Sequence, residues 1–170
     1  ATPQERDRLW QMRKRARGAL GRLAPNYYVH DITVPRHALP AVLARIEAIG
    51  QEHGLKMATY LHAGDGNLHP NILFDAREPG IFQRVLAAGE EILALAVGVG
   101  GTLSGEHGIG LEKRDYLGLI FDEADLEAMR RVKRAFDPAG RFNPDKALPR
   151  PGICREVRPG VKGRVPEGKP

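Results

Sequence analysis

The sequence is poor in the features that mark secreted or membrane-spanning proteins. Its one cysteine, Cys154, excludes an internal disulfide and fits a reducing compartment. No apolar run approaches the roughly 18 residues that a transmembrane helix requires, and no signal peptide opens the chain. We therefore expect a cytoplasmic protein.

An initial methionine is also lacking, and a helical pattern begins almost at once. This start suggests a fragment or a processed chain. With 42% apolar residues, 170 residues suffice for one domain with a real core. We expect that domain over residues 1–148. Residues 149–170 are rich in Pro, Gly and Arg without periodicity, which predicts an extended or disordered basic tail.

The net charge of +5 is concentrated at the two ends of the chain. Residues 1–22 carry seven Lys and Arg against two acids, and residues 150–170 carry six against two, which leaves residues 23–149 at −4. A nucleic-acid surface needs basic residues interleaved with the folded body and exposed aromatic rings. We therefore expect no nucleic-acid partner, and interpret the basic ends as solvated flanks or contacts to an acidic neighbour.

The apolar periodicity predicts an α+β fold. In order we expect a helix, a strand, a helix, two strands and two further helices, over residues 4–23, 27–34, 38–50, 56–62, 68–74, 80–97 and 123–136. Strand–helix–strand–strand–helix is most of a split βαβ unit. The prediction is a ferredoxin-like antiparallel sheet with helices on one face, followed by a C-terminal helical segment.

Two helices are expected to carry an apolar stripe, and the stripe of the second helix is expected to point inward. In residues 4–23 and in residues 123–136, which Asp122 caps, apolar side chains recur at helical spacing. They are Leu9, Met12, Ala16, Leu20 and Leu23 in the first helix, and Leu126, Met129, Val132 and Phe136 in the second.

Two histidines flank a glycine-rich turn in the sequence His62-Ala-Gly-Asp-Gly-Asn-Leu-His69. If Asp65-Gly66 forms a type I′ turn, His62 lies directly opposite His69, with Tyr60 and Asn71 on the same face of the sheet. Two imidazoles so placed can bind one metal ion, and zinc is the commonest choice for nitrogen ligands.

A Glu-His pair lies in a second glycine-rich segment, Gly105-Glu106-His107-Gly108. This pair could complete a metal site, for which two histidines are too few. Glu106 would supply a third metal ligand, and His107 a base of suitable pKa for a proton near a carboxylate. Four polar groups among apolar neighbours are costly to bury unless they bind something.

Each of these features also has a purely structural interpretation. The two histidines can be packed and hydrogen-bonded across the hairpin, and Glu106-His107 can form the N-terminus of a helix. Asp65 can be a turn residue alone. The glycines at positions 98, 100 and 101 can simply end a helix.

Four segments carry a resemblance to a known family: His62–Asn71, Gly101–Gly110, Phe136–Pro138 and Phe142–Lys146. Through them the sequence resembles, over about residues 8–148, the C-terminal cap domain of FAD-linked oxidases of the vanillyl-alcohol-oxidase type. Tyr27-Tyr28, Asp31 and Val34–Arg36 most resemble the group of bacterial glycolate oxidase flavoprotein subunits and D-lactate dehydrogenases.

The resemblance implies a divalent metal, with zinc in first place, held by His62, His69 and Glu106. It implies that His107 takes the proton of the substrate's 2-hydroxyl while hydride passes to the flavin, and that Asn71 contacts the substrate. Arg13 would clamp the substrate carboxylate, for which a planar guanidinium is suited. Asn143 would approach the flavin. Arg13 as one charge among many, and Asn143 as a turn residue, are the corresponding structural interpretations.

The resemblance also implies what the chain needs from elsewhere. The FAD would be bound by a domain or subunit absent from this chain, since the glycine-rich segments follow the wrong elements for a dinucleotide fold. An iron–sulfur electron-acceptor subunit is an implied partner, and partner subunits could hold the protein peripherally at the inner membrane.

We expect the substrate- and metal-binding part of an FAD-dependent oxidoreductase that oxidises a small 2-hydroxy acid of the glycolate or D-lactate type, inactive alone. The alternatives are a non-catalytic module that docks on a partner subunit through its basic ends, and a stand-alone zinc hydrolase.

Overall fold

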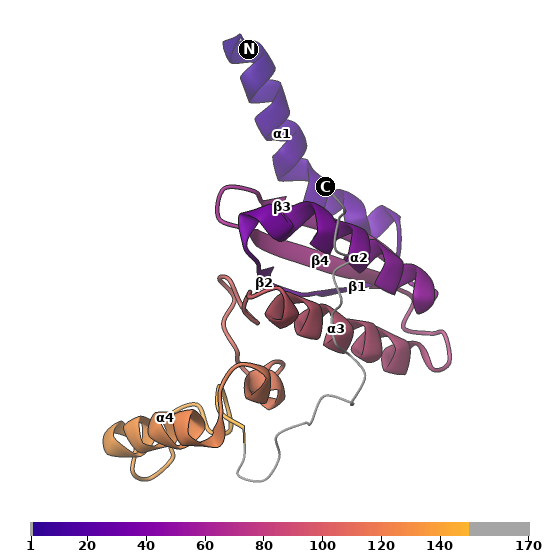
Figure 1. The fold of residues 1–170 in the computed structure, drawn as a ribbon. Helices are drawn as coiled ribbons and strands as arrows, with labels where there is room; N and C mark the ends of the chain where they lie inside the picture. The colour runs from indigo at the N-terminus through magenta and orange to yellow at the C-terminus, as the bar shows by residue number, and fades with distance from the viewer. Residues whose placement is uncertain (1, 150–170) are drawn as a thin grey trace, which may run out of the picture.

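The computed structural model describes residues 2–149 and contains a four-stranded antiparallel sheet (Figure 1). Its central strand, β4, pairs with β3 along one edge and with β1 and then β2 along the other. A bridge between Thr33 and Thr102 adds a further segment outside β2. The strands are β1 (Asn26–Val29), β2 (Ile32–Thr33), β3 (Lys56–His62) and β4 (Asn67–Phe74).

Two helices, α2 (Leu39–Glu52) and α3 (Ile81–Gly98), lie side by side against one face of this sheet (Figure 1). Their apolar side chains form the core together with Ile32, Leu68 and Ile72 from the strands. The α+β class, with sheet and helices in the expected order, is therefore confirmed.

The remaining helical elements lie around this body. Helix α1 (Pro3–Ala19) projects beyond the sheet and ends in the 3₁₀ turn η1 (Leu20–Arg22), while α4 (Glu123–Phe136) lies apart from the sheet (Figure 1). Asp122 caps α4 as expected, in a capping box with Asp125. The sequence did not predict the 3₁₀ helices η2 (Arg36–Ala38) and η3 (Arg114–Leu119).

The predicted strand 27–34 is interrupted at His30 and Asp31, which separate β1 from β2. His30 donates its N–H to the carbonyl of Pro70 in β4, at 2.8 Å. Proline has no N–H to return this bond, so the ladder is broken at that point. The interruption places Asp31 beside His69 on the sheet face opposite the helices.

The hairpin register differs from the prediction by two residues. His62 pairs with Asn67 and Tyr60 pairs with His69, so the turn contains four residues, 63–66. Gly66 alone among these four has a positive φ, +80°, which rules out a type I′ turn. Since the shift is even, the two histidines keep a common face and become diagonal neighbours. Asp65 has the structural role, because its carboxylate accepts the N–H of Asn67 at 3.1 Å.

The inward direction predicted for the stripe of residues 123–136 holds for Leu126 and for Met129, which packs against the core, but not for the other two members, and the stripe of α1 is also largely exposed. Leu9 and Met12 of α1 are each 62% exposed, because α1 projects beyond the body. In α4, Leu126 is buried, whereas Val132 and Phe136 are 60% and 82% exposed. The sequence periodicity predicted these two helices, but it did not show which of their apolar side chains the rest of the chain buries.

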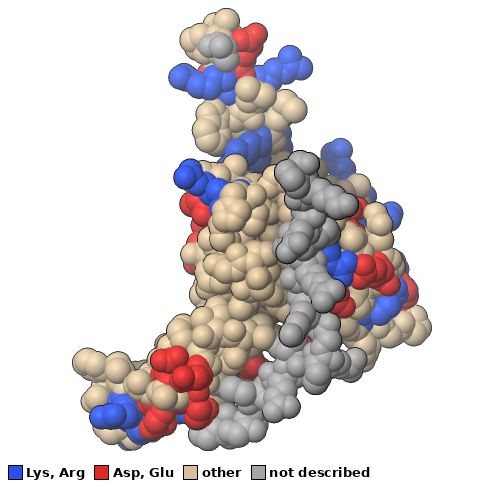
Figure 2. Space-filling model, in the orientation of Figure 1, with Lys and Arg blue, Asp and Glu red and all other residues tan. Residues whose placement is uncertain are grey.

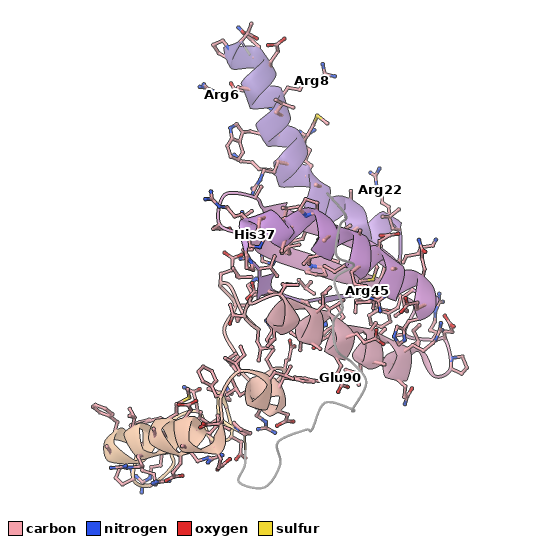
Figure 3. The ribbon with its side chains drawn as sticks, viewed as in Figure 1. Arg6, Arg8, Arg22, His37, Arg45 and Glu90 are labelled. Atoms are coloured by element: carbon pink, nitrogen blue, oxygen red, sulfur yellow. The ribbon has the colours of Figure 1, made fainter. Side chains whose placement is uncertain are left out.

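Charged side chains crowd the projecting end of the molecule. Lys and Arg residues, with a few acids, cover the end of α1 (Figure 2), where Arg6 and Arg8 extend away from the body (Figure 3). Asp122, Glu123 and Asp125 give the start of α4 an acidic character.

The expected basic tail falls outside the described residues except for Pro149. In residues 2–149, no helix combines the length and apolar character needed to cross a membrane.

His30 is a buried histidine on the helix-covered face of the sheet, 3% exposed. It packs against Gly89 of α3, where an added Cβ would lie 2.4 Å from His30 Nε2. Burial, and secondarily the charge of Lys113, lowers the pKa of His30 to about 4.

This shift predicts a loss of stability in mild acid. Between pH 6.5 and 4 the unfolded chain protonates His30 while the folded chain does not, so the free energy of unfolding should fall by up to about 3 kcal/mol. Urea denaturation across this pH range, compared between wild type and His30→Gln, isolates the contribution. Parallel pH curves for the two proteins would contradict the assignment.

Candidate metal and substrate site

The site is built on the sheet face that α2 and α3 leave free. Side chains alternate along β4, so Leu68 and Ile72 enter the core while Asn67 and His69 face the other way. Cross-strand pairing adds Tyr60 beside His69 and His62 beside Asn67. The ring of Tyr60 stacks on that of His69, with centroids 4.7 Å apart.

Three groups with metal-ligating atoms converge here. The ligating atoms of His62, His69 and Glu106 all lie within 4.8 Å of one another. Glu106 Oε1 is 2.9 Å from His69 Nε2 and 3.7 Å from His62 Nε2. His107 joins the cluster, with its Nε2 4.0 Å from the same oxygen.

The environment of His69 favours its neutral form. Burial lowers the pKa of His69; the charges of Asp31 and Glu106 oppose this shift, and those of His107 and His62 add to it. Its Nδ1 is buried and has no hydrogen-bond partner among the described residues. A neutral imidazole is the form that binds metals.

Glu106 and His107 reach this face on a loop that the sheet edge holds in place. Helix α3 ends at Gly98, and the chain returns to pair Thr102 with Thr33. Gly105 then packs so closely that an added Cβ would lie 2.5 Å from Thr33 Oγ1 and 2.6 Å from Asn67 Cγ. The segment is irregular rather than the helix N-terminus considered from the sequence.

The carboxylate of Asp31 anchors the same loop. It accepts the Ser104 hydroxyl at 2.7 Å and the N–H groups of Gly105, Glu106 and His107 at 3.0, 3.1 and 2.8 Å. Successive N–H groups around one anion form a concave nest.

Asp31 is fully buried and remains ionised. Burial would raise the pKa of its carboxyl, but hydrogen bonds from Ser104, His107 and Glu106 and the charge of Lys113 outweigh burial and hold that pKa well below its usual range. Lys113 is itself buried and donates to the Asp31 carbonyl at 2.6 Å, with its Nζ 3.7 Å from the carboxylate. A buried charge requires such a partner.

A cleft of about 560 Å³ lies between this face and the end of α1. Its polar lining includes the two imidazoles of the hairpin, Glu106 and His107, and its apolar wall includes Ala58, Leu61 and Leu20. Helix α1 contributes two cations, Arg13 and Lys14, and the guanidinium of Arg13 donates to His62 Nδ1 at 3.3 Å.

The structure thus brings together five of the seven residues singled out from the sequence: Arg13, His62, His69, Glu106 and His107. Asn71 is buried on the same face but does not line the cleft, because its amide donates to the carbonyls of Ala58 and His69. Asn143 is exposed in a turn after α4, with φ +44° and its Oδ1 accepting from Lys146 at 3.4 Å. Neither Asn71 nor Asn143 joins the cluster.

Sequence reasoning gave no role to Asp31, Ser104 or Lys113. Their bonds join residues more than 70 positions apart, which periodicity does not detect. The one local signal was the pair His30-Asp31 inside an otherwise aromatic and β-branched strand pattern.

The chain is similar in sequence to known proteins. The family model for the C-terminal domain of FAD linked oxidases matches residues 1–147. The glycolate oxidase subunit GlcD of Escherichia coli K12 is 49% identical over 152 residues, covering 89% of this chain and 30% of that protein.

Two further relatives carry other names. A D-2-hydroxyglutarate dehydrogenase of Stutzerimonas stutzeri is 36% identical over 84% of this chain and 31% of its own length. A D-lactate dehydrogenase of Archaeoglobus fulgidus is 37% identical over 71% of this chain and 26% of its own length. The chain thus spans under a third of each of these three relatives. It belongs to the family of FAD-linked oxidase C-terminal domains.

Proposed function

We propose that this chain is the substrate- and metal-binding part of an FAD-dependent enzyme that oxidises a small 2-hydroxy acid. The names of the relatives support this class, because glycolate, D-lactate and D-2-hydroxyglutarate share a hydroxyl next to a carboxylate. The observation that carries the proposal is the convergence of His62, His69 and Glu106 beside His107 and Arg13 in one cleft.

The three residues fit a divalent cation. Two imidazoles and one carboxylate form a common ligand set for catalytic zinc, which leaves a position for substrate. A bound cation would supply Lewis-acid polarisation of the substrate's hydroxyl and carboxylate. The close contact of Glu106 with two histidines, one fully buried, agrees with this donor set.

The chain's own residues would then divide the work. Arg13 binds the substrate carboxylate from the α1 wall, with Lys14 beside it as a second cation. His107 is 48% exposed toward the cleft and accepts the proton of the 2-hydroxyl. The flavin, bound outside this chain, would accept the hydride.

Family membership favours this reading over the stand-alone zinc hydrolase. The flavin-binding domain is the proposed partner, and the cytoplasm the proposed location.

Isothermal titration of the 170-residue chain with Zn²⁺ tests the metal part of the proposal.

Wild type should bind one Zn²⁺, and His62→Ala, His69→Gln and Glu106→Gln should each weaken binding by about 100-fold or more, because even outer-shell changes around a metal cost 10–100-fold. His53→Ala is the matched control, since His53 forms a comparable pair with Glu91 at 2.8 Å, between α2 and α3. Equal affinity in all four variants would refute the metal site.

Arg13 should determine binding of the substrate carboxylate. In the zinc-loaded chain, glycolate and D-lactate should shift the NMR signals of His62 and His107, and Arg13→Gln should weaken their binding about tenfold or more, as expected for a charge-assisted hydrogen bond. Arg8→Gln removes an exposed cation from the same helix and should have little effect (Figure 3). Similar losses in both variants would show unspecific attraction instead.

A further inference from the structure

The carboxylate of Asp31 has no part in the chemistry proposed above, yet it is a fully buried charge next to the site. It lies at the break between β1 and β2, beside the position of His69 in the neighbouring strand. Every donor that the loop offers it comes from the four consecutive residues 104–107.

Two of those donors are the backbone N–H groups of Glu106 and His107 themselves. The side chains of both residues are about half exposed, 52% and 48%, and within the cluster they contact His62 and His69. Whether they can reach these histidines depends on the backbone that carries them, and Asp31 holds this backbone at both residues.

Further bonds tie Asp31 and the loop to the body. Ser104 donates to Asp31 and accepts the N–H of Gly108 at 2.8 Å, which closes the loop on itself. Lys113 binds the Asp31 carbonyl and so ties the anchor to η3, which it precedes. These bonds fix the loop relative to β4, the strand that carries His69.

We propose that Asp31 is a positioning residue: it holds Glu106 and His107 against His69 through the backbone of residues 104–107 and touches neither metal nor substrate. The purpose of this positioning rests on the proposed function, whereas the hydrogen bonds of Asp31 do not depend on any bound group.

A second buried carboxylate provides the control. Asp137, at the end of α4, accepts the N–H groups of Arg141 and Phe142 at 2.8 and 2.9 Å and pairs with Lys133. It therefore anchors a loop in the same way as Asp31, but none of its hydrogen bonds within residues 2–149 involves residues of the site.

The test compares Asp31→Asn with Asp137→Asn in the full 170-residue chain. Asp31→Asn should weaken Zn²⁺ binding by 10–100-fold, and should speed amide exchange at residues 105–107 about tenfold or more. Asp137→Asn should change neither, even where the two variants lose similar stability in urea. Ser104→Ala, which removes one of the four donors to Asp31, should have a smaller effect in the same direction. It replaces Asp31→Asn in this test if that variant does not fold.

A metal-free measurement separates this inference from the proposed function. In wild type, NMR should show a nuclear Overhauser effect between the carbon-bound ring protons of His69 and the Cγ protons of Glu106, which the 2.9 Å distance from Nε2 to Oε1 brings near each other, and Asp31→Asn should abolish it. Retention of this contact in Asp31→Asn would overturn the positioning role even if zinc binds. Its loss, together with no zinc binding by wild type, would uphold the positioning role and refute the metal site.

Discussion

The whole arrangement depends on the alternation of side chains along β4. The strand is buried on both faces, with apolar residues toward the helices and polar residues toward the cleft. Its position in the middle of the sheet gives His69 neighbours on both sides: Tyr60 across one edge and Asp31 beside the other. A strand at the edge could not provide both. The candidate site is thus a property of the sheet's centre, although its residues come from a hairpin and a loop.

Charge compensation is the second constraint. Near the face opposite the core, Asp31 and Lys113 are buried charges, and each has a partner, whereas Glu106 is about half exposed. Asp31 is matched by four hydrogen bonds and by Lys113, and Glu106 contacts two histidines. A network of buried charges costs free energy unless every charge is paired, because an unpaired buried charge loses its hydration and gains no compensating interaction. Because Asp31 has all its partners without the side chains around Glu106, those side chains remain available for a ligand.

The sequence predicted the class of the fold and most of the cluster because both follow from local patterns. Apolar periodicity located the sheet and the helices, and the glycine-flanked histidines marked the site. The hairpin register was wrong, since Asp65-Gly66 suggested a shorter turn than the four-residue one observed. The face of His62 and His69 was still right, because a shift by two residues preserves the alternation. An odd shift would have separated them.

What the sequence could not supply is non-local. Whether the stripes of α1 and α4 are covered depends on how those helices leave the body, and Leu9 and Phe136 proved exposed. The role of Asp31 depends on a loop more than 70 residues away. Asn71, expected at the substrate, instead binds the backbone of its own sheet. A local motif can place residues on a surface, but tertiary packing decides which of them meet.

The cleft has one consequence for stereochemistry. Its polar groups come from three directions: Arg13 from the helical wall, His62 and His69 from the sheet, and His107 from the loop. Under the roles proposed here, the carboxylate would meet Arg13 and the hydroxyl would meet His107, while the C2 hydrogen would face the flavin. Three different substituents held in this way distinguish mirror images. Handedness at the carbinol carbon would then be set jointly by this chain and by the domain that binds the flavin.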